Sequence, residues 1–411
     1  MEEKKKKVVV AFSGGLDTSF TVMYLAKEKG YEVYAACANT GGFSEEQLKQ
    51  NEENAYKLGA VKYVTLDVTR EYYEKSLKYM VFGNVLRNGT YPISVSSERI
   101  FQGLAIARYA NEIGADAIAH GSTGAGNDQI RFELGIKALA PDIKIIAPWR
   151  MTDVWKMQSR QDEIDFCKAH GIDLPFSADS SYSRDRNLWH ISHEGLELED
   201  PACEPNYDDL LVLGVSPEKA PDEAEYVTMT FEKGVPKSIN GEEMKVSDII
   251  RKLNELGGKH GVGICDIVEN RVVGMKSRGV YETPGGTILY EAHQQLEELV
   301  LDRATYEVKE EMGNKLSQVV YEGKWFTPLR EAIQAFIEST QEYVTGEVKF
   351  KLYKGNIIKA GTTSPYSLYS ESLASFTTGD LYDHHDADGF INLFGLPLKV
   401  RAMKMAEVEG K

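Results

Sequence analysis

Cysteine is scarce in this chain of 411 residues, and its placement excludes two kinds of cross-linked scaffold. The four cysteines, Cys37, Cys167, Cys203 and Cys265, lie far apart and form no C-x-x-C pair. They indicate neither a zinc site nor a disulfide framework, and they fit a reducing, cytoplasmic setting. The length of 411 residues suffices for two or three domains with a buried core, and the hydrophobic content of 42% is that of ordinary soluble proteins, so we expect the chain to fold without cross-links.

Long hydrophobic runs are also lacking. No window approaches the roughly 20 apolar residues that a membrane-spanning helix needs. The opening MEEKKKKVVV places basic residues before apolar ones, but the apolar run is too short for the core of a signal peptide. We therefore expect a solvated tail that leads into a strand, and no membrane partner.

Positive charge is in deficit, with 47 Lys and Arg against 63 Asp and Glu and a net charge of −16. Affinity for nucleic acid comes largely from Lys and Arg that neutralise phosphates, so this balance predicts no nucleic-acid partner. A small anionic substrate needs only a local pocket, and that class of ligand remains open.

The first 170 residues alternate short apolar runs with longer amphipathic ones. Strands are expected at VVVAF, EVYAACA, VKYVTLD, DAIAH and KIIAP, and helices near 18–29, 45–58, 70–82, 99–113, 128–138 and 152–169. This alternation predicts βαβ units and a parallel sheet that helices cover on both faces. In such open sheets, ligands bind beyond the carboxyl ends of the strands.

From about residue 171 the pattern changes to Ser-, Pro- and Asp-rich loops around shorter strand-like runs such as YVTMTF, which predicts a second, α+β domain. Near its end, EVKFKLYKGNIIKAGT predicts a hairpin that turns at 354–356. Beyond residue 366, scattered apolar residues have little to pack on locally. This stretch is either an arm that docks on another subunit or a frayed end. The expected domains are 1–170, 171–365 and 366–411.

Residues 13–19 read SGGLDTS and join an apolar strand to an amphipathic helix. Glycine lets the backbone approach a ligand closely, and a helix N-terminus offers N–H groups and a favourable dipole. Ser13, Thr18 and Ser19 add hydroxyl donors. A plain turn with Ser and Thr caps would account for one or two of these residues only, so the run predicts a phosphate-binding loop.

This loop lacks the lysine of a Walker motif and the G-x-G-x-x-G spacing of a dinucleotide fingerprint. It resembles instead the PP-loop of the N-type ATP pyrophosphatases. The resemblance implies that the β and γ phosphates of ATP are held as a pyrophosphate unit while a substrate oxygen attacks the α phosphorus. The product would be an adenylated intermediate.

Longer runs narrow the resemblance. HGSTGAGNDQIRFE at 120–133, APWR at 147–150, GKHGVG at 258–263, the run at 266–293 and SPYSLY at 364–369 resemble the argininosuccinate synthase family, and the likeness extends over nearly the entire chain. It implies an α/β protein with a Rossmann-like, parallel-sheet nucleotide-binding domain, an α+β synthetase domain and a C-terminal oligomerisation arm in a homotetramer. It also implies an ATP-dependent ligase of arginine biosynthesis that joins citrulline to aspartate and releases AMP and pyrophosphate, with Mg²⁺.

The same resemblance implies the site residues, and Asp17 and Asp128 among them are the catalytic candidates. The implied ATP-binding residues are Ala11, Phe12, Ser13, Gly14, Gly15, Leu16, Asp17, Thr18, Ser19, Ala38 and Gly121. The implied aspartate-binding residues are Thr123, Asn127 and Asp128. The implied citrulline-binding residues are Tyr91, Ser96, Asn127, Arg131, Ser183, Ser192, Glu269 and Tyr281, and no protein-bound metal is expected.

Physical chemistry supports several of these roles. Asp128 could pair with a substrate ammonium, Arg131 offers fixed donors to a carboxylate, and Glu269 is a natural partner for an ammonium. Each also has a simpler interpretation: Asn127 could cap a helix that starts at residue 128, and Arg131 could pair with a surface acid.

One stretch and two single positions depart from the family pattern. The stretch 91–100 loses a glycine, a threonine and a proline, Ala125 replaces a lysine, and Gly42 replaces a glutamine. These departures leave two alternatives open: adenylation of another amide or urea substrate, and a nucleotide-binding regulator without catalysis.

Two further patterns resemble metal-binding motifs, but each lacks residues that such a motif requires. Residues 383–389, DHHDADG, lack acids where an EF-hand needs them and are expected to form a solvated acidic turn. His190 and His193 lie at helical spacing without further ligands, so we expect structural roles for both.

Overall fold

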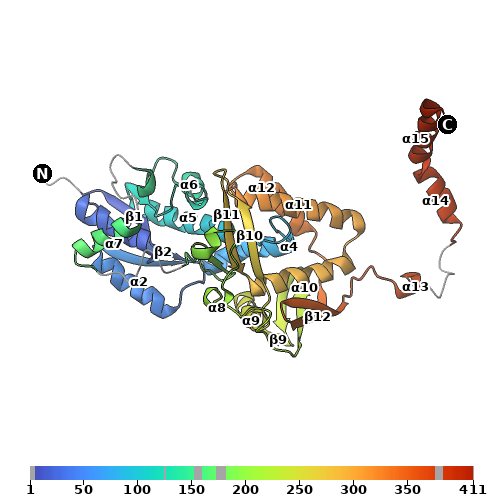
Figure 1. Cartoon of the computed structure of the whole chain (residues 1–411), viewed down its shortest axis with the longest axis horizontal. Helices are drawn as coiled ribbons and strands as arrows, with labels where there is room; N and C mark the ends of the chain where they lie inside the picture. Colours follow the sequence, from blue (N-terminus) through green and yellow to red (C-terminus); the bar gives the residue numbers. More distant parts are fainter. Residues whose placement is uncertain (1–4, 125, 152–159, 173–181, 375–382, 411) are drawn as a thin grey trace. The chain divides into compact units, whose positions relative to one another are not determined.

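The computed structural model describes residues 5–124, 126–151, 160–172, 182–374 and 383–410 (Figure 1). Its contacts divide the chain into two compact units, Met1–Tyr366 and Ser367–Lys411. Within the described ranges, no helix combines the length and the apolar character needed to cross a bilayer.

The N-terminal part of the first unit is a five-stranded parallel sheet in the order β3-β2-β1-β4-β5. Its strands are β1 (Lys7–Ala11), β2 (Glu32–Asn39), β3 (Lys62–Asp67), β4 (Ala117–Ala119) and β5 (Lys144–Ile146). The helical segments are α1 (Leu16–Met23), η1 (Tyr24–Glu28), α2 (Glu45–Lys57), α3 (Thr69–Tyr72), η2 (Tyr73–Leu77), α4 (Lys78–Phe82), α5 (Ser94–Ile113), α6 (Asp128–Leu139), η3 (Pro148–Arg150) and α7 (Arg160–Ala169).

Strand β1 shows why both faces of this sheet are covered. Val8 and Val10 join one hydrophobic cluster with residues of α1, α2 and α7, whereas Val9 joins another with residues of α5 and α6. Successive side chains of a strand point to opposite faces, so a run of valines buries both. Figure 1 shows α5 and α6 on one side of β1 and β2, and α2 on the other.

The strand order reverses direction at β1. The chain adds β2 and β3 on one side of β1 and returns to add β4 and β5 on the other. The loops that follow β1 and β4 therefore leave the carboxyl edge of the sheet in opposite directions. In open parallel sheets, ligands bind at the point where the strand order reverses in this way. The two loops touch: a Cβ added to Gly121 would lie 3.0 Å from the Cβ of Asp17.

Two antiparallel sheets form the rest of the first unit, in the orders β10-β11-β6 and β13-β12-β7-β8-β9. Their strands are β6 (Ile191–His193), β7 (Glu225–Glu232), β8 (Val235–Ile239), β9 (Glu242–Glu243), β10 (Ile264–Asn270), β11 (Lys276–Glu282), β12 (Gly346–Tyr353) and β13 (Asn356–Thr363). The helical segments are η4 (Leu196–Glu199), α8 (Tyr207–Leu210), α9 (Val246–Lys259), α10 (Pro284–Val300), α11 (Arg303–Tyr321) and α12 (Pro328–Ser339). Their main hydrophobic cluster includes residues of α4 and α5, so the N-terminal and later segments share one core.

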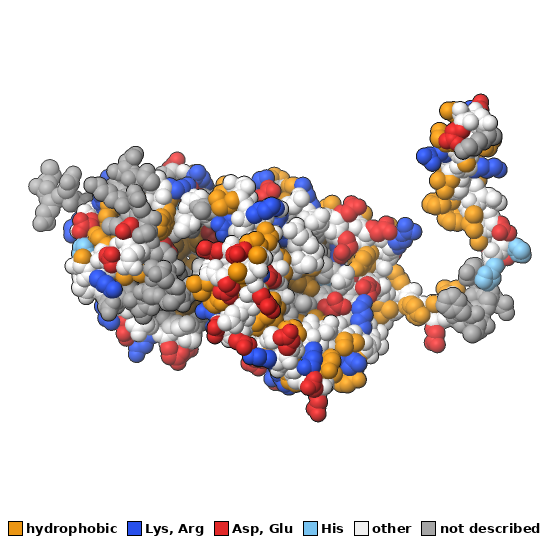
Figure 2. Space-filling model, viewed as in Figure 1, with side chains coloured by type: hydrophobic (Ala, Val, Ile, Leu, Met, Phe, Trp, Pro, Cys, Tyr) orange, Lys and Arg blue, Asp and Glu red, His pale blue; other side chains and the backbone are white. Residues whose placement is uncertain are grey.

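The second unit consists of α13 (Glu371–Ala374), α14 (Asp386–Phe394) and α15 (Leu396–Glu409). No described residue of these helices is buried, and large apolar side chains such as Phe390, Phe394 and Leu398 are 65%, 76% and 73% exposed. Figure 2 shows hydrophobic side chains along α14 and α15.

The observed elements confirm the α/β fold class and the predicted hairpin at 354–356. The helix expected at 99–113 begins earlier, at Ser94. Of the helix expected at 152–169, residues 152–159 lie outside the described part of the chain, and α7 accounts for the remainder. The helical spacing of His190 and His193 was misleading, because His193 belongs to strand β6.

Candidate active site

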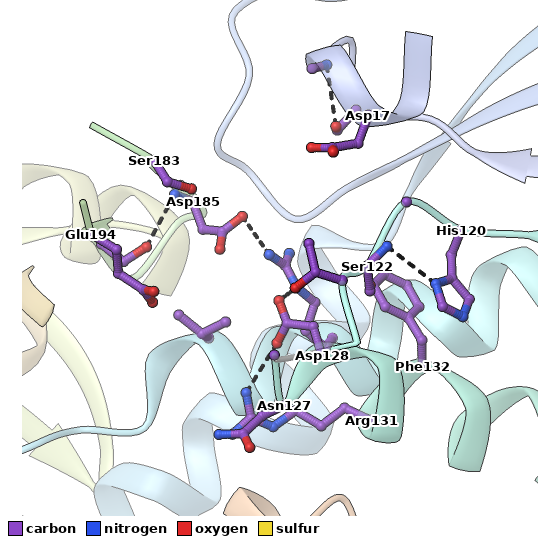
Figure 3. A pocket seen from close by; sticks show the side chains of 18 of the residues that line it. Asp17, His120, Ser122, Asn127, Asp128, Arg131, Phe132, Ser183, Asp185 and Glu194 are labelled. Atoms are coloured by element: carbon purple, nitrogen blue, oxygen red, sulfur yellow. Dashed lines mark hydrogen bonds and ion pairs between the residues drawn. The ribbon is translucent and has the colours of Figure 1, made fainter. Parts of the chain in front are cut away.

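A cavity of about 330 Å³ lies beyond the carboxyl ends of β1 and β4 and is closed on its other side by β6, β10 and β11 (Figure 3). Its size suits a small-molecule ligand. The predicted residues that line it are Ala11, Ser13, Gly15, Asp17, Thr18, Tyr91, Gly121, Thr123, Asn127, Asp128, Arg131, Ser183, Ser192, Glu269 and Tyr281. Residues up to 270 positions apart thus meet at one site.

The 13–19 loop is held by its own hydroxyl groups. Helix α1 starts at Leu16 with Gly15 as its N-cap, and no side chain caps it. The Thr18 hydroxyl donates to the Gly15 carbonyl at 3.1 Å and lies 3.3 Å from the Ser13 hydroxyl. The first-turn N–H groups of a helix have no acceptor within the helix, so this loop can offer them to an anion.

Gly14 is required by the loop geometry. Its φ is 80°, and a Cβ there would lie 2.1 Å from Oδ1 of Asn51. Asn51 also donates to the Ser13 carbonyl at 3.3 Å, and Trp149 donates to Oδ1 of Asp17 at 3.2 Å. The loop is therefore supported from α2 and from the segment after β5.

The segment between β4 and α6 is braced from the first turn of α6. The Gln129 side chain donates to the carbonyls of Gly124 and Gly126 at 2.7 and 3.0 Å. His120 is buried, and its Nδ1 accepts from the Ser122 N–H at 3.2 Å. These bonds shape the backbone around the predicted aspartate-binding residues.

Arg99 of α5 links three carboxylates around the cavity. It donates to Oδ2 of Asp128 at 2.8 Å, forms an ion pair with Asp185, and lies 3.5 Å from Oε2 of Glu98. Its side chain is only 12% exposed. Arg99 was not predicted as a site residue, although it is the arginine of the 91–100 stretch.

Asp128 is held by a second cation as well. Nη1 of Arg131 lies 3.1 Å from Oδ1 of Asp128, one helical turn away. Burial opposes ionisation of Asp128, but Arg99 and Arg131 outweigh it and keep the pKa of this carboxyl below its ordinary value. Asp128 is therefore an anion with two cationic partners before any substrate ammonium arrives.

Glu269 lies in a wall of aromatic residues. It is buried, and its two oxygens accept from the hydroxyls of Tyr281 and Tyr321, the latter at 2.7 Å. The rings of Tyr91 and Tyr281 pack at 4.1 Å between centroids. Burial is the main cause that raises the pKa of both stacked tyrosines well above the ordinary value, so their hydroxyls stay protonated and can donate.

Two of the predicted serines lie at strand β6: Ser192 belongs to it, and Ser183 pairs with Glu194 just after it. Ser183 exchanges backbone hydrogen bonds with Glu194 at 2.8 and 3.0 Å, and the Ser192 hydroxyl accepts from the Asp185 N–H at 3.1 Å. Tyr281 pairs with Ser192 across β11 and β6. Figure 3 shows Ser183, Asp185 and Glu194 facing Asp128 across the cavity.

Glu194 is an acid of the cavity lining whose pKa is raised. Burial raises its pKa to about 7, and Asp128, Asp185 and Glu269 add to the rise while Arg271 opposes it. Its Oε2 lies 3.0 Å from Nη2 of Arg271. A carboxyl that titrates near neutrality can accept or release a proton under working conditions.

Several predicted residues do not reach the cavity lining: Phe12, Gly14, Leu16, Ser19, Ala38 and Ser96. Ser96 is the clearest case. It is completely buried in the first turn of α5, and its hydroxyl has no hydrogen-bond partner there. Because α5 starts at Ser94, residue 96 faces the protein interior, which the linear motif did not indicate.

Of the departures from the family pattern, the structure accounts for one. A Cβ on Gly42 would lie 2.0 Å from the carbonyl oxygen of Arg186, so no side chain fits at this position. Ala125 lies outside the described residues.

The residues that the sequence did not single out include Arg99, Asp185, Glu194, Arg271 and Tyr321. Arg271 stands inside the 266–293 run that carried the resemblance, so its position there was an available signal. Arg99 stands in the 91–100 stretch that departs from the family pattern, and Glu194 directly follows His193, so neither had such a signal. Tyr321 stands in an amphipathic helix with no motif around it.

The acidic and metal-ligating side chains of the cavity bear on metal binding. Within the described ranges, no group of three or more His, Cys, Asp or Glu side chains is arranged to hold a metal ion. Asp17 is nevertheless a carboxylate of the 13–19 loop that lines the cavity. Mg²⁺ commonly uses one carboxylate together with substrate phosphates.

Comparison with known proteins matches both parts of the chain. The family model described as "Arginosuccinate synthase N-terminal HUP domain" matches residues 7–173, and the one described as "Arginosuccinate synthase C-terminal domain" matches residues 182–401. The chain is 70% identical over 407 residues to argininosuccinate synthase from Agathobacter rectalis, which covers 99% of each chain. It is 67% identical over 407 residues to the protein of that name from Lachnospira eligens, again over 99% of each chain. For Lachnoclostridium phytofermentans the identity is 66% over 405 residues, which covers 98% of this chain and 99% of that protein.

Proposed function

The chain belongs to the argininosuccinate synthase family, and from this premise we propose that the cavity beside the 13–19 loop is its active site. The chain has argininosuccinate synthase activity, that of an ATP-dependent ligase in arginine biosynthesis. One observation carries the placement of the site. The switch in strand order at β1 brings the phosphate loop into the same cavity as Glu269, Arg131 and Asp128.

The reaction has two steps. The ureido oxygen of citrulline attacks the α phosphorus of ATP, the bond between the α phosphorus and the bridging oxygen breaks, and pyrophosphate leaves. The aspartate amine then attacks the ureido carbon of the citrullyl adenylate, and the bond to AMP breaks. No protein nucleophile takes part, so catalysis comes from positioning and charge stabilisation.

The loop side of the cavity holds ATP in this proposal. The N–H groups at the start of α1 and the hydroxyls of Ser13 and Thr18 receive the departing pyrophosphate. Asp17 would hold Mg²⁺ together with the phosphates, and the ion would neutralise charge on the leaving group. Gly121 has no side chain, so the nucleotide can approach the backbone beside Asp17.

The opposite side holds the two amino acids. Citrulline lies against Tyr91, Tyr281, Ser183 and Ser192, with its carboxylate on Arg131 and its ammonium on Glu269. Aspartate binds Thr123, Asn127 and Asp128, and Asn127 also contacts citrulline. Ser96 belongs to this proposal only as a residue behind the site, because it is buried in α5.

The aspartate amine must lose a proton before or during its attack. Asp128 is a weak base because two guanidinium groups stabilise its anion, so it acts as a fixed negative charge near the amine. Glu194 lies partly buried across the cavity, and its pKa lies near neutrality. We assign proton acceptance to Glu194.

The proposal extends to assembly and setting. Apolar side chains of α14 and α15 are exposed on the isolated chain, and they would be covered if this arm docks on other copies in a homotetramer. The cysteines and the net charge fit a cytoplasmic enzyme with no nucleic-acid partner.

Pyrophosphate release with each substrate omitted in turn tests the proposal. Release of pyrophosphate from ATP should require citrulline, and argininosuccinate should appear only when aspartate is added. Adenylation of another urea or amide in place of citrulline would contradict the substrate assignment. ATP binding without turnover for any pair would contradict catalysis at this site.

A further inference from the structure

Tyr321 lies at the C-terminal end of α11, outside the cavity lining, and is 1% exposed. It contacts Asn127, Arg131 and Glu269, which come from two other elements and are all assigned to citrulline above. In the part of the chain that the structure describes, no other residue of α11 forms a hydrogen bond with these three.

The Tyr321 hydroxyl joins two of them. It donates to Oε2 of Glu269 at 2.7 Å and accepts from Nδ2 of Asn127 at 3.1 Å. Oδ1 of Asn127 accepts in turn from the Val272 N–H at 2.8 Å, so both ends of this amide have partners. Since Tyr281 donates to the other oxygen of Glu269, the carboxylate is oriented by a tyrosine on each side.

The backbone and ring of Tyr321 hold the third residue. Its carbonyl accepts from Nε and Nη2 of Arg131, each at 3.1 Å. This carbonyl is free to do so because the last C=O groups of a helix have no N–H donor within the helix. The guanidinium groups of Arg87 and Arg131 lie 3.7 and 4.9 Å from the ring centroid. The remaining Nη1 of Arg131 reaches Asp128.

We propose that Tyr321 is a positioning residue that orients the citrulline-binding groups Asn127, Arg131 and Glu269 through one hydroxyl and one carbonyl. This inference rests on the proposed function, because it takes those three residues to bind citrulline. Burial, aided by Glu269, raises the pKa of Tyr321, so the hydroxyl remains a donor throughout the working range of pH.

Tyr321→Phe separates the hydroxyl from the ring and the carbonyl, which the variant keeps. The measurement is citrulline-dependent exchange of pyrophosphate into ATP by the full-length enzyme, which isolates the first step. We expect the KM for citrulline to rise roughly tenfold or more, as for a lost hydrogen bond to a charged group, while the KM for ATP stays within about twofold.

Tyr290→Phe is the matched control. Tyr290 is also a buried tyrosine, its hydroxyl donates to the Val85 carbonyl at 3.2 Å, and neither residue lines the cavity. We expect it to lower the melting temperature without a change in either KM. If Tyr321→Phe behaves in the same way, its role is structural and the inference is wrong.

Glu269→Gln distinguishes a failure of the citrulline-site assignment from a failure of the positioning role of Tyr321. If it raises the KM for citrulline and Tyr321→Phe does not, the site assignment stands and the positioning role fails. If Glu269→Gln leaves that KM unchanged, the site assignment fails, and the role of Tyr321 fails with it. A rise with both variants supports both.

Discussion

The Nε atom of Arg99 lies 2.8 Å from Oδ2 of Asp128, and this contact joins α5 to the first residue of α6 at the cavity. Asp185 completes the arrangement from the opposite wall. One guanidinium therefore holds carboxylates that come from three segments of the chain, Glu98 being the third.

Arg99→Gln should remove the guanidinium that Glu98, Asp128 and Asp185 share, and leave Asp128 with Arg131 alone. We expect the free energy of unfolding to fall by about 3 kcal/mol and turnover to fall by roughly a hundredfold or more. Urea unfolding and steady-state kinetics measure the two effects. Arg108→Gln is the control, because Arg108 lies on the same helix and pairs with Glu71 at the surface. An equally small effect of both variants would contradict the role of Arg99.

Asp17→Ala should abolish turnover while the protein stays folded, because Asp17 is the carboxylate beside the departing pyrophosphate. We expect a loss of about a hundredfold or more in kcat, with an unchanged circular dichroism spectrum. Asp67→Asn, at the carboxyl end of β3, is the control and should keep nearly normal activity. A nearly normal rate for Asp17→Ala would exclude the loop from catalysis.

Glu194 should produce an acid limb in the pH profile of kcat/KM for aspartate, centred near its pKa of about 7. Below this pH the carboxyl is protonated and cannot accept a proton. Glu194→Gln should remove the limb and slow argininosuccinate formation, while citrulline-dependent exchange persists. Because Arg271 lowers the pKa of Glu194, Arg271→Gln should move the limb to higher pH. A limb that neither variant changes would assign it to another group.

Glu98 should make stability depend on pH. Burial raises its pKa from 4.5 to about 7, so the folded state binds this proton more tightly than the unfolded state does. Its contribution is fully present below pH about 4.5 and is lost as pH rises to about 7, by about 3 kcal/mol in total. Urea unfolding at pH 5 and pH 8 should show a smaller difference for Glu98→Gln than for the natural chain. Equal differences would contradict the shift.

Removal of residues 367–411 should change the oligomeric state. These helices expose apolar side chains on the isolated chain, and their burial between subunits would stabilise an assembly. Light scattering after size-exclusion chromatography should give a tetramer for the full chain and a smaller species for the truncated one. Phe394→Glu should weaken the assembly, whereas Asp386→Asn, on the same helix, should not. An unchanged mass after truncation would exclude the arm as the assembly element.

The phosphate loop could be predicted from the sequence because its chemistry is local. Seven consecutive residues contain the turn, the hydroxyls and the helix start, so the strand and helix on either side suffice to place them. The same holds for the contact of Asp128 with Arg131, since residues three apart share one face of a helix. The parallel sheet was also readable, because its strands and helices alternate with regular periods.

Sequence motifs were misleading where the orientation of a side chain depends on packing against residues distant in the chain. Ser96 matched a motif position, but an earlier start of α5 turns it into the core. Tyr321 had no motif, yet the fold brings its carbonyl to Arg131, which lies 190 positions earlier in the chain. The pKa values of Glu98 and Glu194 likewise arise from burial and from charges on other elements. Local patterns thus specify which groups the chain carries. Folding specifies which of them meet, how deeply they are buried and which of them remain charged, because desolvation and long-range contacts have no counterpart in a short stretch of sequence.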